Sequence, residues 1–484
     1  MIRLAARARP IAALQKTRLL YHLPTFATDN TFLSSCRHAS SRPPKFDPHF
    51  FDETLVRTNE SGPSRHFGKG KSDRTDRGLY MEVPDTTEGE FKYMHYMQFS
   101  EVATMNFVRE ILKLPVVPRA WLWSNPDASS AFLKTAVVMK NAEGTPVSAC
   151  ISDIQKSAAN TVRAAHSSWL IEKKVSSITF DRYGSLYQPS SDFMYEIPGS
   201  HKAKVLDGAS PEEKQLIESQ FYIGPSCEPR LFQRDGRHLM EEYHGPWTSA
   251  VDYVESLLRC EIEVLSKKIN ESEVPGGPLD KDGISYEMHV ELLQKALSVV
   301  PHIMPKDSES TSPRLYHPTL GPDDVFYDEE YRVKTIIGWS GASIAPFFES
   351  LHWALQLSPQ SDPIEPEGLI RRLQSEVGGD EFDELCQTLW ERSAMLKKAQ
   401  KNPILPLIHV AMETRRYGTI PLQTLLMHIH SHWIDFDAGE PCPFQIPPEA
   451  KREADKLMDR LVAEGKDKEL IRAIPQVGMW TLGR

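Results

Sequence analysis

The 484-residue chain lacks three features that would assign it to a specialised class. No stretch approaches the ~18 consecutive apolar residues of a membrane span, so an integral membrane protein is not expected. The six scattered cysteines contain no C-x-x-C pair, which argues against a zinc site or a disulfide framework and fits a reducing compartment. Positive charge is not in surplus either, since 56 Lys and Arg face 66 Asp and Glu, and nucleic acid is therefore not the expected partner.

The composition is that of an ordinary globular protein, with 40% hydrophobic and 25% charged residues. The charge is unevenly distributed. Residues 1–40 contain six basic residues and one acidic residue, whereas the remainder contains 50 basic and 65 acidic residues, so a +5 segment precedes a −15 body. The Arg-rich, Ser-bearing and nearly acid-free start is typical of a mitochondrial transit peptide. A disordered basic tail is the alternative interpretation, and neither contributes to the expected fold.

Apolar periodicity and capping residues predict a mixture of helices and short strands. A helix is expected over 98–115, with its apolar residues on one stripe: Val102, Met105, Val108 and Leu112. Ser249 followed by Asp252 predicts the start of a second long helix. Further expected elements are a strand at 135–139, a helix at 286–300, a strand–loop–strand unit at 315–339 and helices through 347–477.

Three alternating histidines, His428, His430 and His432, interrupt an apolar stretch. Helical neighbours are three or four positions apart, so His428 and His432 are expected to share a face. Packed or solvated histidines on an apolar helix are favoured over a metal site.

The densest set of groups suited to phosphate chemistry lies in residues 315–349, LYHPTLGPDDVFYDEEYRVKTIIGWSGASIAPFFE. Phosphoryl transfer needs a carboxylate to orient and deprotonate the acceptor hydroxyl, and amide or carboxylate ligands for Mg²⁺. A loop followed by two strands joined by a turn can supply these groups on one edge.

This segment resembles the catalytic segment of fungal aminoglycoside-phosphotransferase-like proteins, kinase-fold relatives with the approximate pattern H-P-D-L-x-x-x-N-I-F-V-D followed by I-I-D-W. Three further stretches are similar in the same order: SEVATMNFVRE at 100–110, FDRYGSLY at 180–187, and FYIGP at 221–225 leading to HGPW at 244–247. With the presequence, the set resembles the fungal altered inheritance of mitochondria protein 9 group. The resemblance covers most of residues 45–435 and implies an α+β, protein-kinase-like, two-lobed fold. The implied organisation is a transit peptide at 1–40, a reduced N-lobe at 45–140 and a helical C-lobe at 141–484 with a degenerate catalytic hairpin at 315–349.

This chain departs from the family pattern at the positions of the catalytic base and the metal ligands. Where the family has its catalytic Asp, this chain has Thr319, which has no carboxylate to act as a base. Asp324 stands where the family has its metal-binding Asn and could still hold Mg²⁺. Gly338 stands where the family has its second metal ligand, and it has no side chain that could bind a metal. His317 matches the pattern and is expected to have a structural role in the loop, and Asp328 matches a hairpin-turn residue.

The implied small lobe also departs from the pattern. Glu82 stands where the family has a basic residue that contacts nucleotide phosphates, and its carboxylate would repel them. Glu101 matches the helix acid that normally pairs with that basic residue, and the resemblance implies that Glu101, His317 and Asp323 are candidate cofactor-binding residues. Asp323 is adjacent to Asp324, and the two carboxylates could bind a divalent cation. Only Gly68 and Gly70 suggest a glycine-rich loop, and Gly184-Ser185 is expected at the turn of a hairpin within FDRYGSLY.

Three functions follow. The favoured one is a mitochondrial pseudokinase with a binding or regulatory role, whose partner is an unknown mitochondrial protein or small molecule and whose ATP and Mg²⁺, if bound, are bound weakly. The alternative is an active small-molecule kinase, acting on a hydroxyl or amine, that uses displaced acids such as Asp323 or Asp324 as base. An unrelated helical interaction protein would require the four motif matches to be coincidental.

A reporter fused to residues 1–45 is expected to enter the mitochondrial matrix, because the +5 segment precedes a −15 body. Fractionation and protease protection of the fused reporter would measure this. A reporter that stays in the cytosol, as the same fusion with its arginines changed to glutamine should, would contradict the transit-peptide prediction.

Overall fold

The structure is a computed structural model. It describes residues 16–20, 79–84, 91–124, 135–188, 197, 199–231, 236–272, 284–318, 320–350, 366–400, 402–436, 439–446 and 452. Cys36, Gly68, Gly70 and Thr319, which the sequence analysis singled out, lie outside these residues.

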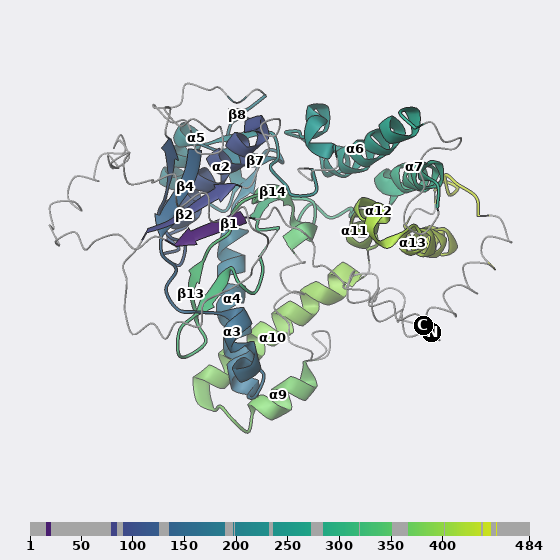
Figure 1. Ribbon diagram of the computed structural model, residues 1–484. Coiled ribbons are helices and arrows are strands. Elements are labelled where there is room, and N and C mark those ends of the chain that lie inside the picture. The colour runs from purple at the N-terminus through teal and green to yellow at the C-terminus, as the bar shows by residue number, and fades with distance from the viewer. Residues whose placement is uncertain are drawn as a thin grey trace, which may run out of the picture.

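An antiparallel four-stranded sheet lies at one end of the molecule, in the order β1-β2-β4-β3 (Figure 1). Its strands are β1 (Lys16–Leu20), β2 (Leu79–Pro84), β3 (Ala120–Ser124) and β4 (Thr135–Lys140). The helix α2 (Phe91–Asn106) continues as a π-helical turn (Phe107–Ile111) and packs against β3 and β4. Strand β4 confirms the strand predicted at 135–139. Strand β1 belongs to the predicted presequence, yet its backbone pairs with β2 along its whole length.

Three small sheets connect this end to the rest of the chain, in the orders β7-β10-β8, β14-β11-β6-β9 and β13-β12-β5. Their strands are β5 (Thr145–Pro146), β6 (Thr179–Phe180), β7 (Ser185–Tyr187), β8 (His201–Lys202), β9 (Val205–Asp207), β10 (Tyr222–Gly224), β11 (Pro313–Tyr316), β12 (Val325–Tyr327), β13 (Val333–Ile336) and β14 (Ser343–Pro346). The predicted strand–loop–strand unit is therefore one separate strand, β11, followed by the antiparallel hairpin β12–β13.

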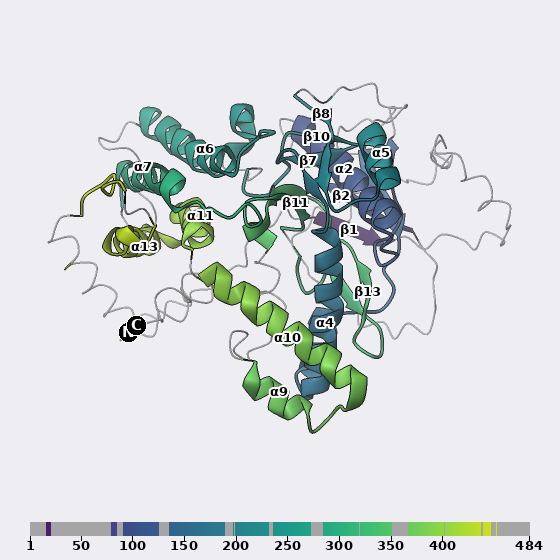
Figure 2. The same ribbon diagram turned by 180° about the vertical axis from the view of Figure 1, so that it is seen from behind.

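The helices make up most of the remaining described residues. They are α3 (Val147–Ile154), α4 (Ala158–Val175), α5 (Pro211–Gln220), α6 (Ala250–Asn270), α7 (Tyr286–Ile303), α9 (Glu367–Leu373), α10 (Gly379–Gln400), α11 (Ile404–Met412), α12 (Thr414–Tyr417), α13 (Ile420–Ser431) and α14 (Trp433–Phe436), with 3₁₀ turns at Arg237–Leu239 and Glu241–Tyr243. Figures 1 and 2 place α6, α7, α11 and α13 together at the end opposite the four-stranded sheet, with α4 and α10 between them. Among the described helices, none combines the length and apolarity that a bilayer crossing requires. The sheets and helices confirm the α+β class.

Two local predictions are confirmed. The Ser249 hydroxyl accepts the backbone N–H of Asp252 at 3.0 Å and caps α6. The rings of His428 and His432 share a face, with centroids 4.2 Å apart. Among the described residues, no group of three or more His, Cys, Asp or Glu side chains could hold a metal ion. The five described cysteines are free thiols.

The hairpin predicted within FDRYGSLY is wrong. Strand β6 pairs with β9 and β11, and β7 pairs with β10, so the two halves of this segment do not pair with each other. Between them, Tyr183 bridges to Trp247 and Gly184 to Ile344. A carbonyl oxygen, that of Gly224, lies 2.3 Å from the position that a Cβ on Gly184 would take, so the glycine permits a close backbone approach between strands rather than a turn.

The pair α4 and α10 joins the middle of the chain to its C-terminal part. Polar contacts along it include Arg163 with Glu381 at 2.6 Å and the Trp169 indole N–H with Glu391 at 2.9 Å. Beneath them, Glu172 on α4 and Arg392 on α10 are 7% and 6% exposed. Burial raises the pKa of the Glu172 carboxyl to about 8, although the charge of Arg392 opposes the shift.

Substitution of Glu172 by Gln is expected to flatten the pH dependence of stability. In the folded protein this carboxyl keeps its proton up to about pH 8, whereas in the unfolded chain it releases it near 4.5. Between these values the folded state binds more protons, so the free energy of unfolding falls as pH rises, by at most about 5 kcal/mol. Urea unfolding at about pH 5, 6, 7 and 8 measures this slope.

The half-buried neighbour Glu391, whose pKa is lowered by a hydrogen bond from Trp169, provides the matched control. Glu391→Gln should leave the downward slope in place. Equal slopes in the wild type and Glu172→Gln would contradict the assignment.

Candidate functional site

The segment predicted to carry catalysis runs from the end of β11 to the turn after β13. His317 follows β11 directly and is fully buried, with its ring packed on that of Trp339 at a centroid distance of 4.8 Å. The Trp339 indole N–H donates to the carbonyl of Ile336 at 3.2 Å. This buried stack supports a structural role for His317. Thr319, two residues after His317 in the sequence, lies outside the described residues.

Asp324 and Gly338, the two positions that resemble the family's metal ligands, lie in contact. One carboxylate oxygen of Asp324, Oδ2, accepts the backbone N–H of Gly321 at 3.1 Å. The other, Oδ1, is 2.6 Å from the position that a Cβ on Gly338 would occupy. The Ile337 N–H donates to the Asp324 carbonyl at 2.9 Å, which fixes the two chain segments side by side. The Asp324 carboxylate therefore lies where a side chain at 338 would begin.

Asp323 is turned toward a different neighbour. Its carboxylate accepts a hydrogen bond from the hydroxyl of Ser148, and the Ser148 N–H donates to the carbonyl of Pro322 at 3.0 Å. These bonds attach the exposed loop to the first turn of α3. The sequence prediction treated Asp323 and Asp324 as one cation-binding pair, but the two carboxylates accept hydrogen bonds from different partners, Ser148 and Gly321.

Asp328 has the turn role expected for it. Its carboxylate accepts the backbone N–H groups of Glu330 and Arg332, each at 2.9 Å, and closes the β12–β13 turn.

The remaining predicted site residues come from the four-stranded sheet and its helix. Glu101 is 3% exposed on α2. Glu82 is on β2, where its backbone is paired with that of Val137. Helix α2 also contacts β7, and the Ser185 hydroxyl of β7 donates to the carbonyl of Ala342 at 3.3 Å. The helix that carries Glu101 is thereby joined, through β7, to the turn that follows Gly338.

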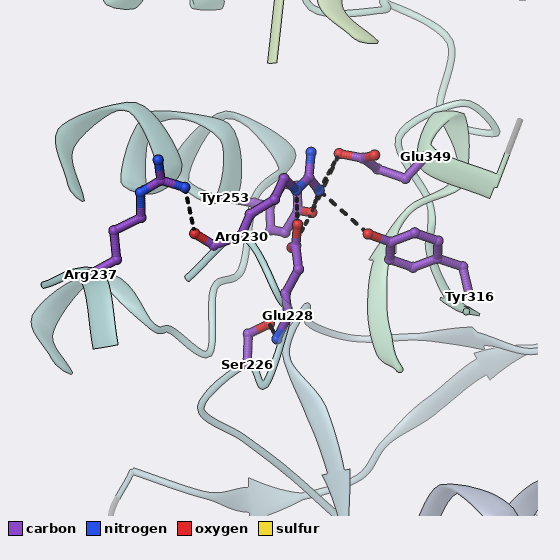
Figure 3. Close-up of polar contacts among 7 residues, drawn as sticks. All are labelled: Ser226, Glu228, Arg230, Arg237, Tyr253, Tyr316 and Glu349. Carbon is purple, nitrogen blue, oxygen red and sulfur yellow. Dashed lines mark hydrogen bonds and ion pairs between the residues drawn. The ribbon is translucent and has the colours of Figure 1, made fainter. Parts of the chain in front are cut away.

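A buried polar network that sequence reasoning missed holds the strand leading into this segment (Figure 3). At its centre the Arg230 guanidinium donates to Tyr253 Oη at 2.8 Å, to Glu349 Oε1 at 2.9 Å and to Tyr316 Oη at 3.4 Å, and it also pairs with Glu228. The Tyr253 hydroxyl donates to Glu228 Oε2 at 2.6 Å. Tyr316 is the residue immediately before His317, so the network fixes the start of the segment.

The network has two carboxylates for one guanidinium. Glu228 and Glu349 are 0% and 1% exposed. Burial raises the pKa of Glu349, the charge of Arg230 opposes the rise, and the charge of Glu228 adds to it. Two buried acids beside one cation favour retention of a proton. No sequence motif could reveal this, because three of the four partners of Arg230, namely Tyr253, Tyr316 and Glu349, lie 23, 86 and 119 residues away.

No protein-family model matches the chain. Curated relatives named altered inheritance of mitochondria protein 9, mitochondrial, are similar to it. The protein from Lachancea thermotolerans is 25% identical over 308 residues, which cover 59% of this chain and 46% of that protein. The protein from Saccharomyces cerevisiae strain RM11-1a is 25% identical over 313 residues, with the same coverage, and that from Clavispora lusitaniae is 24% identical over 287 residues, 56% of this chain and 45% of that protein. The match thus spans about half the length of these relatives, which belong to the group that the sequence motifs resemble.

Solved structures similar to the chain include aminoglycoside phosphotransferases. The GDP and kanamycin complex of APH(2")-IIIa is 12% identical, with a TM-score of 0.32, and covers 78% of this chain and 97% of that one. The AMP-PNP and hygromycin B complex of a thermostable APH(4)-Ia mutant is 11% identical, with a TM-score of 0.32, and covers 80% and 99%.

A side chain at position 338 is expected to destabilise the protein mainly through Asp324. Gly338→Ala should cost about 2–4 kcal/mol, because the residue has a φ of +76° and the added Cβ would meet the Asp324 carboxylate. In an Asp324→Ala background the cost should fall to the backbone strain alone, about 1–2 kcal/mol. Urea unfolding of the four proteins in this double-mutant cycle measures the coupling. An equal cost in both backgrounds would show that Asp324 does not occupy this space.

Proposed function

We propose that this chain, whose curated homologues are altered inheritance of mitochondria protein 9, is a mitochondrial aminoglycoside-phosphotransferase-like protein that is catalytically impaired and has a binding or regulatory role. The contact between the Asp324 carboxylate and Gly338 carries the proposal. The basic presequence and the relatives' names, which place them in mitochondria, support a mitochondrial location, in the matrix. The proposed organisation is a transit peptide at 1–40, a reduced N-lobe at 45–140 and a helical C-lobe at 141–484.

The chemistry of the segment supports impairment. Thr319 offers a hydroxyl where the resemblance requires a carboxylate, and a hydroxyl is not a useful base near neutral pH. Gly338 offers no ligand, and the space beside its Cα is taken by Asp324. Loss of one such group typically lowers the rate by two to three orders of magnitude or more, and here two are missing together.

ATP and Mg²⁺ fit this segment only in part. Asp324 could give a cation one carboxylate oxygen, since its other oxygen already accepts the Gly321 N–H. A single protein carboxylate is a small share of the six oxygens that Mg²⁺ prefers, so binding would be weak and would depend on Asp324. Glu101 and His317, which the resemblance assigned to the nucleotide site, are buried.

An active small-molecule kinase with a displaced base is the second candidate. One observation favours it: Asp323 is an exposed carboxylate only four positions after Thr319 in the sequence. Its hydrogen bond from Ser148 would have to break or rearrange before it could accept a proton from an acceptor hydroxyl or amine.

Purified full-length protein is expected to show no ATP turnover above background with a panel of hydroxyl and amine acceptors, because no acid stands at 319 or 338. Calorimetric titration with ATP, with and without Mg²⁺, should give at most weak binding that Asp324→Ala removes. ATP turnover of the Asp323→Ala and Asp324→Ala variants is measured in parallel with that of the wild type.

Turnover that either substitution abolishes would overturn the proposal in favour of the displaced-base kinase. Turnover that both leave intact identifies a contaminating enzyme, and the proposal then stands.

A further inference from the structure

A cavity of about 510 Å³ lies between α4, the segment 305–314, the residues after β14, and the facing ends of α10 and α11. Its apolar wall is formed by side chains that include Trp169, Phe347 and Met395. Its polar wall includes Glu172, Lys306 and Arg314. Arg314 is the second residue of β11 and His317 follows the strand, so the two lie about 10 Å apart along the chain and the cavity is separate from the segment described above.

The guanidinium of Arg314 is positioned by three contacts. It lies 4.3 Å from the ring centroid of Phe347, its Nε–H donates to Ser312 Oγ at 2.9 Å, and its Nη1 donates to the carbonyl of Ser176 at 3.4 Å. These hydrogen bonds use two of the five N–H groups of an arginine. No carboxylate of the described residues forms an ion pair with it. Such a guanidinium fork, packed against an aromatic ring, suits the recognition of a planar oxyanion.

Glu172 gives the polar wall a second group for a ligand. It is 7% exposed, and its Oε1 is buried with no hydrogen-bond partner among the described residues. A buried polar oxygen without a partner costs roughly 1–3 kcal/mol, so a ligand that hydrogen-bonds to it would gain affinity. Because burial raises its pKa to about 8, this carboxyl is neutral near pH 7 and can donate a hydrogen bond.

The charges around the cavity leave a positive surplus. Lys398 pairs with Asp307 at 3.0 Å and with Glu309 at 3.2 Å, and Lys173 pairs with Glu391 at 3.0 Å. Lys306 donates to the carbonyl of Phe436 at 3.3 Å and, like Arg314, has no carboxylate partner within the described part of the chain. With Glu172 neutral, the three cations Lys306, Arg314 and Lys398 face two carboxylates of the wall, Asp307 and Glu309, which leaves a surplus of one positive charge.

We infer that this cavity is a binding site for a small organic carboxylate with an apolar body. The carboxylate would lie against the Arg314 fork and accept a hydrogen bond from the Glu172 carboxyl, while the apolar body packs against Trp169, Phe347 and Met395. The single negative charge of such a ligand would be balanced by the Arg314 guanidinium, and the protonated Glu172 carboxyl would donate one hydrogen bond to it. A cavity of about 510 Å³ has the size of an ordinary small-molecule site. The inference does not depend on whether residues 315–349 transfer phosphate.

Isothermal titration of the full-length protein with phenylacetate, hexanoate, phenyl phosphate and phenethylamine tests the inference. At about pH 6.5 the two carboxylates should bind and the amine should not. Arg314→Gln should lower the affinity for phenylacetate at least about tenfold, and Arg314→Lys should lower it less. Arg259→Gln, which removes an exposed charge elsewhere, is the control and should leave this affinity unchanged.

Binding by the wild type should weaken above about pH 8, because a deprotonated Glu172 would repel the ligand, whereas Glu172→Gln should keep its affinity across this range. The other charged groups that face the cavity are Lys173, Lys306, Asp307, Glu309, Arg314 and Lys398, and Arg392 lies beside Glu172.

If Arg314→Gln fails to fold, Met395→Trp keeps the Arg314 fork, fills the apolar wall and should abolish binding. Three results would overturn the inference: amine binding that Glu172→Gln removes, phenyl phosphate bound about tenfold or more tighter than phenylacetate, or no carboxylate binding at about 10 mM. Carboxylate binding unchanged by both Arg314→Gln and Met395→Trp would place the ligand elsewhere and would also overturn it.

Discussion

The buried guanidinium of Arg230 is the interaction on which the arrangement around residues 313–349 depends. It contacts Glu228, which precedes it by two residues, Tyr253 on α6, and Tyr316 and Glu349 on either side of the β12–β13 hairpin. Removing one member of such a buried ionic group leaves charge uncompensated, which typically costs about 3–5 kcal/mol. Because Tyr316 is bonded to this centre and His317 follows it, the entry to the candidate site is fixed to the helical end of the molecule.

The packing around Asp324 distinguishes a replaced site from one that has merely lost a ligand. Gly338 has a φ of +76°, a conformation that suits glycine, and the Asp324 carboxylate fills the space beside it. Asp324 in turn accepts the Gly321 N–H, so its position is part of the loop's own hydrogen bonding. A metal ligand introduced at 338 would therefore need several neighbours to move. A change of this kind fits a protein selected for binding or for shape rather than for phosphate transfer.

Structural features that depend on residues close together in the sequence could be predicted, whereas contacts between residues far apart in the sequence could not. The cap at Ser249, the strand at Thr135–Lys140 and the turn at Asp328 each follow from residues within a few positions. The hairpin predicted around Gly184 failed because this backbone pairs with Ile344, which lies far along the chain. Likewise the resemblance identified Asp324 and Gly338 as the altered positions, but their steric contact depends on the folded loop. No sequence pattern indicates that Glu172 is buried, since its burial depends on how α10 covers α4.

Strand β11 gives the cavity and the candidate site one shared rigid element. Arg314 faces the cavity at its start, Tyr316 bonds to Arg230 at its end, and His317 follows. The strand is held on one side by β14 and touches β6 on the other, so it has little freedom to move alone. A ligand that draws on the Arg314 guanidinium therefore acts on the same strand that fixes the loop of His317.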